Sequence, residues 1–243
     1  MKKAKVHILY YGSHMSPLSD LISGAGKNGE KILTPSLGIF IDHPEAKIVV
    51  DTGWNDDLPQ IGKDMGHIYS EEHTPIGQLR KLGVNPAAID LVVLTHMHFD
   101  HVGGIRHFPG KTVLVRRAEL EKAFVPPRNS NFLYLRSDFD VPDVRYETID
   151  GDMDYQLCPG VLLLATPGHT LGSQSVLIDT EEGSVLYAGD AIYLFDNWEK
   201  HLMPGICYSQ PLQMETMSKL RGLGRFHLIP GHDPKVDVNK IYG

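Results

Sequence analysis

The sequence predicts a mixed α/β protein (α+β by some schemes), and two observations carry that prediction. Short runs rich in Val, Ile, Leu and Tyr recur along the chain and are bounded by Gly, Pro, Asp or His, as strands commonly are. Segments with helical spacing of apolar residues fall between some of these runs. Strands that come in pairs and then meet helices are typical of sheets covered by helices.

Each expected strand combines aliphatic residues with turn residues at its ends. The expected strands are Lys5–Tyr11, Leu37–Asp42, Lys47–Asp51, Leu91–Leu94, Thr112–Val115, Val161–Thr166, Ser175–Asp179, Ser184–Tyr187 and Phe226–Ile229. One expected helix begins with Thr74 as N-cap and Pro75 at its first position, and it runs to about Gly83. The other expected helices are Arg117–Phe124 and Leu212–Gly222.

Three segments show no regular pattern, namely Ser13–Pro35, Trp54–His73 and Phe195–Pro211. Each is rich in turn-forming residues with scattered apolar side chains. Long irregular segments in a compact domain commonly cover an active site. We therefore expect these three segments to form lids, with flexible surface loops as the alternative.

Composition narrows the class of protein. At 243 residues the chain fits one domain over residues 1–243, and 42% hydrophobic with 22% charged residues is ordinary for a globular protein. The 23 Lys and Arg against 30 Asp and Glu give a net charge of −7. An acidic chain without a basic run argues against a nucleic-acid partner.

Location is predicted from missing signals. No apolar run approaches the roughly 20 residues that a membrane span needs, so no membrane partner is expected. The basic N-terminus Met1–Lys5 resembles the start of an export signal, but no small-residue cleavage site follows it. We therefore interpret this region as the start of the first strand and not as an export signal. Cys158 and Cys207 stand alone, which argues against a disulfide scaffold and a zinc ribbon. We expect a cytoplasmic protein.

The most informative stretch is Leu91–Gly104, where a strand-like run leads into four potential metal ligands. His96 and His98 are two residues apart, so in extended backbone they point to the same side. Asp100 and His101 follow in a tighter turn. All four are good ligands for a borderline divalent metal, and the absence of cysteine disfavours a structural zinc site.

Three further candidates follow strands at turns rich in Gly or Pro: His169, Asp190 and His232. Ligands placed at strand ends suit a site that is built on a rigid sheet. The remaining histidines lack this context, and we expect structural or surface roles for them: His7, His14, His43, His67, His73, His107, His201 and His227.

The chain resembles the metallo-β-lactamase superfamily in the order and spacing of four motifs: HMHFDH at residues 96–101, PGHT at 167–170, GD at 189–190 and PGHD at 230–233. The resemblance implies a four-layer αββα sandwich with metals at one edge between the sheets. It narrows to the N-acyl homoserine lactonases through Phe99 and through Tyr193, which lies three residues after Asp190.

Carried over to this sequence, the resemblance implies two divalent metal ions. His96, His98 and His169 hold one, whereas Asp100, His101 and His232 hold the other, with Asp190 bridging both. Zinc is the expected metal, with manganese, iron or cobalt as alternatives for nitrogen and oxygen ligands. Asp51 is expected to orient a ligand histidine by a hydrogen bond.

The implied reaction is hydrolysis of a small-molecule lactone, most of all an N-acyl homoserine lactone, by a metal-bridging hydroxide. Tyr193 is expected to stabilise the oxyanion, and Asp100 to carry the proton as well as bind metal. Five apolar residues are expected to line the substrate pocket: Met15, Leu18, Phe99, Ile192 and Phe195.

Other enzyme functions stay open within the same superfamily, such as hydrolysis of a different lactone, a β-lactam, or a thioester as in glyoxalase II. A non-catalytic metal-binding or sensor module would bind metal without turnover. The lid segments of such lactonases can form a dimer interface, so the protein is expected to be a monomer or a homodimer.

Overall fold

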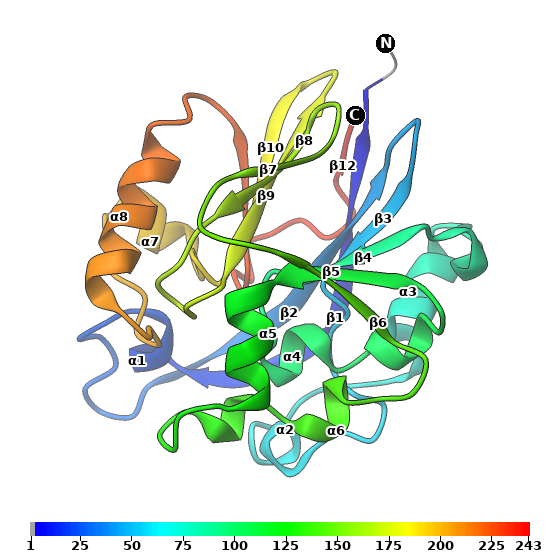
Figure 1. The fold of residues 1–243 in the computed structure, drawn as a ribbon. Coiled ribbons are helices and arrows are strands. Elements are labelled where there is room, and N and C mark those ends of the chain that lie inside the picture. The colour runs from blue at the N-terminus through cyan, green and yellow to red at the C-terminus, as the bar shows by residue number, and fades with distance from the viewer. Residues whose placement is uncertain (1–2) are drawn as a thin grey trace.

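Residues 3–243 are described by the computed structural model and form two packed β-sheets flanked by helices (Figure 1). Met1 and Lys2, which belong to the segment that we interpret as no export signal, lie outside the described residues. The strand order is β12-β1-β2-β3-β4-β5-β6 in the larger sheet and β11-β10-β9-β8-β7 in the smaller.

The larger sheet contains a long antiparallel hairpin and a parallel part. Its strands are β1 (Lys5–Pro17), β2 (Lys31–Asp42), β3 (Lys47–Val50), β4 (Leu91–Val93), β5 (Thr112–Arg116), β6 (Arg145–Ile149) and β12 (Ile241–Tyr242). Strands β12, β1, β2 and β3 pair antiparallel, whereas β3 to β6 pair parallel. The parallel part brings the loop after β4 to one edge of the sheet.

The smaller sheet is antiparallel except for the pair of β10 and β11. Its strands are β7 (Tyr155–Cys158), β8 (Val161–Ala165), β9 (Gln174–Thr180), β10 (Gly183–Gly189) and β11 (His227–Pro230). Strands β10 and β11 are parallel, so both end at the same edge.

Eight α-helices connect or cover the sheets in the part of the chain that is described. They are α1 (Leu18–Leu21), α2 (Gln60–Asp64), α3 (Pro75–Lys81), α4 (Phe99–Val102), α5 (Arg117–Phe124), α6 (Arg136–Phe139), α7 (Phe195–Glu199) and α8 (Gln210–Arg221). Short 3-10 turns occur at Glu71–His73, Pro86–Ala88, Ile105–His107 and Asn131–Leu133. In the region 3–243 no helix is long and apolar enough to cross a membrane.

Alternation along the strands creates the layers, because successive side chains point to opposite faces of a sheet. Ile39 and Ile41 of β2 belong to the apolar cluster between the sheets, whereas Phe40 belongs to the cluster under α3, α4 and α5. In β10 Tyr187 faces the other sheet, and Leu186 packs toward α8. Helices lie outside both sheets (Figure 1), so the four-layer αββα sandwich is confirmed.

The expected helices and strands are found with small shifts at their ends. Helix α5 has the expected bounds, and α3 begins as expected because the Thr74 side chain accepts a hydrogen bond of 2.9 Å from the Gly77 N–H. Strands β6, β7 and β12 were not expected. All three lie at the edges of the two sheets. In β6, Arg145–Ile149, exposed residues alternate with more buried ones, and the charged side chains at the exposed positions make this edge strand look like a loop in the sequence.

The three irregular segments contain more regular structure than the sequence indicates. Residues 13–17 continue β1 and residues 31–35 begin β2, so the first segment is mostly a long hairpin. The second segment contains α2, and the third contains α7. The expectation of irregular structure in these parts was therefore wrong. Polar residues such as Ser13 and Ser16 hide the strand pattern, although both are buried.

Candidate dinuclear metal centre

The loop after β4 is held by Asp51, which follows β3. Asp51 Oδ1 accepts a hydrogen bond of 2.7 Å from the Thr95 N–H, and Asp51 Oδ2 accepts bonds from Thr95 Oγ1 at 2.7 Å and Tyr187 Oη at 3.0 Å. Asp51 has a φ of 60°, which is unusual for a residue other than glycine. These bonds fix where the chain leaves the sheet toward His96.

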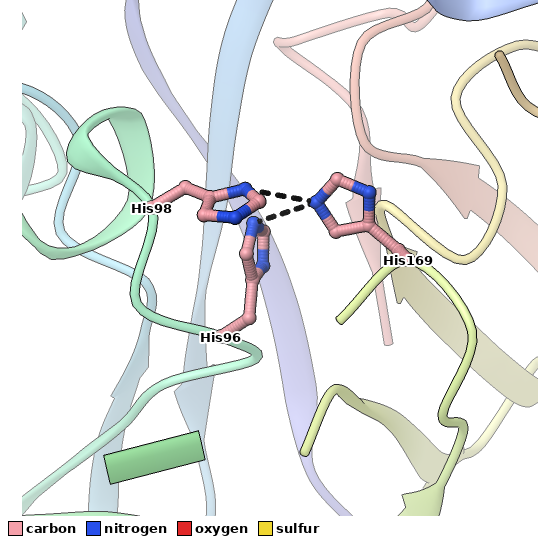
Figure 2. Close-up of side chains that lie close together, drawn as sticks. All are labelled: His96, His98 and His169. Carbon is pink, nitrogen blue, oxygen red and sulfur yellow. Dashed lines mark hydrogen bonds between the residues drawn. The ribbon is translucent and has the colours of Figure 1, made fainter. Parts of the chain in front are cut away.

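The first group of candidate ligands brings the two halves of the protein together. His96 and His98 come from the loop after β4, and His169 comes from the loop after β8 (Figure 2). His169 Nε2 lies 3.1 Å from His96 Nε2 and 3.0 Å from His98 Nδ1. Asp190 Oδ2 completes the group at 3.3 Å from His169 Nε2 and 3.8 Å from His96 Nε2.

The second group lies on the other side of the same carboxylate. Asp190 Oδ1 is 3.3 Å from His101 Nε2 and 3.1 Å from His232 Nε2. Asp100 Oδ2 lies 3.7 Å from His101 Nε2 and 3.6 Å from His232 Nε2. The structure thus brings together all seven residues predicted as metal ligands, with Asp190 between the two groups.

These separations fit a bound divalent metal in each group. Four atoms around a tetrahedral zinc at about 2.0–2.1 Å lie roughly 3.3–3.4 Å apart. The observed spacings of 3.0–3.8 Å lie around that value. His101 Nε2 and Asp190 Oδ1 are moreover buried and make no hydrogen bond within residues 3–243. A shared metal would satisfy both atoms, which otherwise would be costly to bury.

Hydrogen bonds on the far side of three rings orient their free nitrogens toward the site. Asp51 Oδ2 accepts a bond of 2.9 Å from His101 Nδ1, the Pro35 carbonyl accepts one of 2.8 Å from His232 Nδ1, and the Ile206 carbonyl one of 3.2 Å from His169 Nδ1. Such outer partners fix the tautomer and leave Nε2 for the metal. The bond from His101 to Asp51 is the one that the sequence predicts.

Close approach of backbone explains two of the glycines near the ligands. A Cβ at Gly231 would lie 2.7 Å from Asp190 Oδ1, so a side chain there would displace the shared carboxylate. A Cβ at Gly103 would lie 2.3 Å from the Asn55 backbone nitrogen. Gly103 has a φ of −59°, so close packing rather than a special turn conformation requires glycine after His101.

The two groups differ in their electrostatics. Burial, together with neighbouring histidines, lowers the pKa of His96 and His98 well below that of a free imidazole. Burial is the largest single influence on the pKa of His101 and His232 and acts to lower it, but the surrounding carboxylates, Asp190 first and then Asp100, together outweigh burial, so the pKa of both is raised. The first group therefore offers neutral imidazoles, and the second is dominated by carboxylate charge.

Glu119 of α5 joins the two ligand loops and was not predicted from the sequence. Its Oε1 accepts a hydrogen bond of 3.0 Å from the Met97 N–H, between two candidate ligands. Its Oε2 accepts bonds of 2.6 Å from Thr170 Oγ1 and 3.2 Å from the Gly172 N–H, just after His169. Burial raises the pKa of Glu119, while these donors oppose that shift. A helical glutamate carries no sequence signal for this role.

A cavity opens above the shared carboxylate. His98, Asp100, His169, Asp190 and His232 lie in its floor and walls. All three segments that we expected to form lids contribute to its lining, the first with Leu21, the second with Met65 and the third with Ile206. The three segments that the sequence singled out thus border the cavity.

The predicted pocket residues are distributed unevenly. Phe99 lines the cavity. Ile192 is fully buried beside Leu186 in the cluster under α8, and Met15 is 37% exposed. Leu18 packs in the small cluster with Leu21, and Phe195 begins α7. Of the five predicted pocket residues only Phe99 is part of the cavity lining in the described chain.

Tyr193 lies in the cavity wall next to a candidate ligand. Its Oη is 3.0 Å from His169 Nδ1. When Nε2 faces the metal, the single Nδ1–H lies between the Ile206 carbonyl and Tyr193 Oη and can donate to both, so the phenol keeps its own proton for the cavity. Burial and then the carboxylates of Asp190 and Asp100 raise the pKa of Tyr193 well above its usual value. Tyr193 is therefore a neutral hydrogen-bond donor.

Comparison with known proteins identifies the family. Residues 33–234 match the metallo-beta-lactamase superfamily, which is most of the chain. The chain belongs to the metallo-beta-lactamase superfamily. Within it, the chain is 31% identical to the N-acyl homoserine lactonase AttM of Azorhizobium caulinodans, over 96% of this chain and 95% of that protein.

Two further proteins similar to this chain are also described as hydrolases of N-acyl homoserine lactones. An N-acyl homoserine lactonase from a Bacillus species is 33% identical over 79% of this chain and 78% of its own. A solved N-acyl homoserine lactone hydrolase, with the product N-hexanoyl-L-homoserine bound at its catalytic metal centre, has a TM-score of 0.84 and 27% identity. That match covers 97% of this chain and 95% of the solved chain.

Proposed function

We propose that the protein is a two-metal hydrolase that opens the ring of N-acyl homoserine lactones. The observation that carries this proposal is the Asp190 carboxylate, which lies between two groups of buried ligand atoms at the floor of a cavity. The superfamily and the curated lactonase relatives indicate a metal-dependent hydrolase that acts on a lactone ester.

Seven side chains would hold two divalent metals, with zinc as the expected ion. His96, His98 and His169 would hold the first, Asp100, His101 and His232 the second, and Asp190 would bind both. When bound, such a metal pair lowers the pKa of a coordinated water toward neutrality and supplies a nucleophile for an ester carbonyl. The histidines and carboxylates would hold the pair rigidly, because strand ends on both sheets position these side chains.

Tyr193 would act on the carbonyl oxygen of the lactone. Its hydroxyl lines the cavity and stays protonated, because burial and nearby carboxylates raise its pKa. A neutral phenol that donates to the oxygen as negative charge develops there stabilises the transition state more than the ground state.

Asp100 would carry a proton to the alkoxide that leaves as the ring opens. Its carboxylate lines the cavity and is the most exposed of the candidate ligand carboxylates, with a side-chain exposure of 12% against 5% for Asp190. A carboxylate at this place can accept a proton from the attacking water and donate it to the departing oxygen.

A groove of mixed polar and apolar lining lies beside the metal cavity, and its apolar side chains suit the acyl chain. This groove shares His98, His169, Leu133 and Ile206 with the cavity, so the two spaces meet there. It continues past three exposed apolar residues: Phe132, Leu171 and Tyr208. We propose this groove as the acyl-chain site, in place of most of the pocket residues predicted from the sequence.

We also propose that residues 1–243 form one hydrolase domain, because ligands from both sheets build a single centre. A cytoplasmic location and a monomeric or homodimeric state are part of the same proposal. Cell fractionation and light scattering of the purified protein test them directly.

The experiment that tests the function is ring opening of homoserine lactones with acyl chains of increasing length. Protein purified with its metals is assayed by proton release, and Asp190→Asn serves as the variant that lacks one of the shared carboxylate oxygens. Turnover by the wild type that is lost in Asp190→Asn supports the proposal. Absence of turnover with about two metals bound per chain would discard this substrate class, and other lactones and thioesters would then be assayed.

A further inference from the structure

His14 lies beside the second group of candidate ligands, although its sequence context indicates a structural or surface histidine. It is 3% exposed and lines the cavity. One of its ring nitrogens, a carboxylate oxygen of Asp100 and a ring nitrogen of His232 all lie within 4.8 Å of one another. The rings of His14 and His232 meet edge to face, with centroids 5.9 Å apart.

The surrounding residues hold His14 in this place. In the long hairpin it pairs with Thr34, whose hydroxyl donates a hydrogen bond of 3.3 Å to the His14 carbonyl. Trp54 packs against the ring at 5.4 Å between centroids. His14 Nδ1 is 3.5 Å from Ser36 Oγ, and that oxygen accepts a bond of 2.7 Å from Trp54 Nε1. Nε2 is then the ring nitrogen left for the cavity.

We propose that His14 is an additional ligand of the metal held by Asp100, His101 and His232. Two ligands on opposite sides of a zinc ion lie roughly 4.2 Å apart, so atoms within 4.8 Å of one another reach a common ion after a small side-chain shift. Zinc in catalytic sites is not confined to four ligands and sometimes takes a fifth. The inference rests on the metal centre proposed above.

This ligand would change the character of the second metal position. Without His14 that position has two imidazoles and two carboxylates, and with His14 both metals have three imidazoles. Additional nitrogen favours zinc over harder ions such as manganese, which prefer oxygen ligands. His14 would thus bias the second position toward zinc.

The test compares His14→Gln with a matched variant, His67→Gln. His67 is also buried and stacks on Trp54 at 4.4 Å between centroids, but it is not part of the cavity lining. Bound zinc is counted by elemental analysis, and its affinity is measured by titration against a chromophoric chelator. We expect His14→Gln to bind one zinc normally and the other at least about tenfold more weakly. His67→Gln should bind both zinc ions as the wild type does.

The outcomes separate this inference from the proposed function. If His14→Gln holds both zinc ions with wild-type affinity, His14 is not a ligand and the inference is wrong. If the wild type itself fails to bind two zinc ions, the proposed metal centre is wrong as well.

A measurement on the wild type alone covers the case in which His14→Gln does not fold. Protein with isotopically labelled histidines is loaded with cadmium, and each metal-bound imidazole is detected by its coupling to cadmium in NMR spectra. Six coupled imidazoles support the inference, whereas five, matching His96, His98, His101, His169 and His232, would overturn it.

Discussion

The Asp51 carboxylate accepts a hydrogen bond of 2.9 Å from His101 Nδ1, and both groups are fully buried. The bond directs His101 Nε2 to the shared carboxylate. We expect Asp51→Asn to weaken metal binding by about 10- to 100-fold, because the amide offers one acceptor oxygen where the carboxylate accepts from several donors. Titration with zinc against a chelator measures the change. Asp179→Asn, at an exposed carboxylate of β9, should bind zinc as the wild type does.

Glu119 connects the loops that carry the first group of ligands. In Glu119→Gln an amide NH₂ replaces one acceptor oxygen and faces donors such as Thr170 Oγ1 or the Met97 N–H. A buried donor left unpaired costs about 1–3 kcal/mol, so the free energy of unfolding should fall by that amount. Metal affinity should fall too, since the loops of His96 and His169 lose their common support.

The control for Glu119 lies on the same helix. Glu121→Gln changes an exposed side chain of α5 and should alter neither stability nor metal content. Equal zinc affinity of Glu119→Gln and the wild type would show that the carboxylate serves the fold alone. Chemical denaturation and zinc titration together distinguish the two roles.

The sequence predicts those features that depend on local pattern. Strand ends with His and Asp at Gly or Pro turns could be recognised, and the structure brings all seven predicted ligands together. His14 and Glu119 could not be recognised, because a single histidine in a strand and a single glutamate in a helix gain their roles only from contacts with distant segments. The substrate pocket is hard to predict for the same reason, because which side chains line the cavity depends on how three segments fold over the site; of the five predicted pocket residues, Phe99 lines it.

Tyr193 is predicted to act in the chemical step. Tyr193→Phe removes the hydroxyl that faces the cavity and should lower kcat by about 100- to 1000-fold, with a smaller change in KM. The same substitution removes the contact with His169 Nδ1 at 3.0 Å, so metal content must be measured alongside. Unchanged kcat in a fully metallated variant would contradict the oxyanion role.

Ile206 is predicted to control access of long acyl chains, because it lines both the metal cavity and the adjoining groove. Ile206→Trp fills the junction, while the backbone carbonyl that accepts from His169 Nδ1 is retained. We expect KM for long-chain substrates to rise at least about tenfold, a value typical of lost apolar contacts in a pocket. KM for the shortest substrate should change little. An equal rise for both would place the acyl chain elsewhere.

His67 is predicted to make stability depend on pH. Burial lowers its pKa from 6.5 to about 4. Between these values the unfolded chain binds a proton at His67 that the folded protein does not bind, so stability falls as pH decreases through this window. The loss due to His67 is at most about 3 kcal/mol at pH 4 and is absent above pH 6.5. His67→Gln cannot take up this proton and should flatten the dependence. Urea denaturation of both proteins from pH 4 to 7 measures the difference, in which contributions from metal release cancel. Parallel curves would show that His67 is protonated in the folded state, contrary to its burial against Trp54.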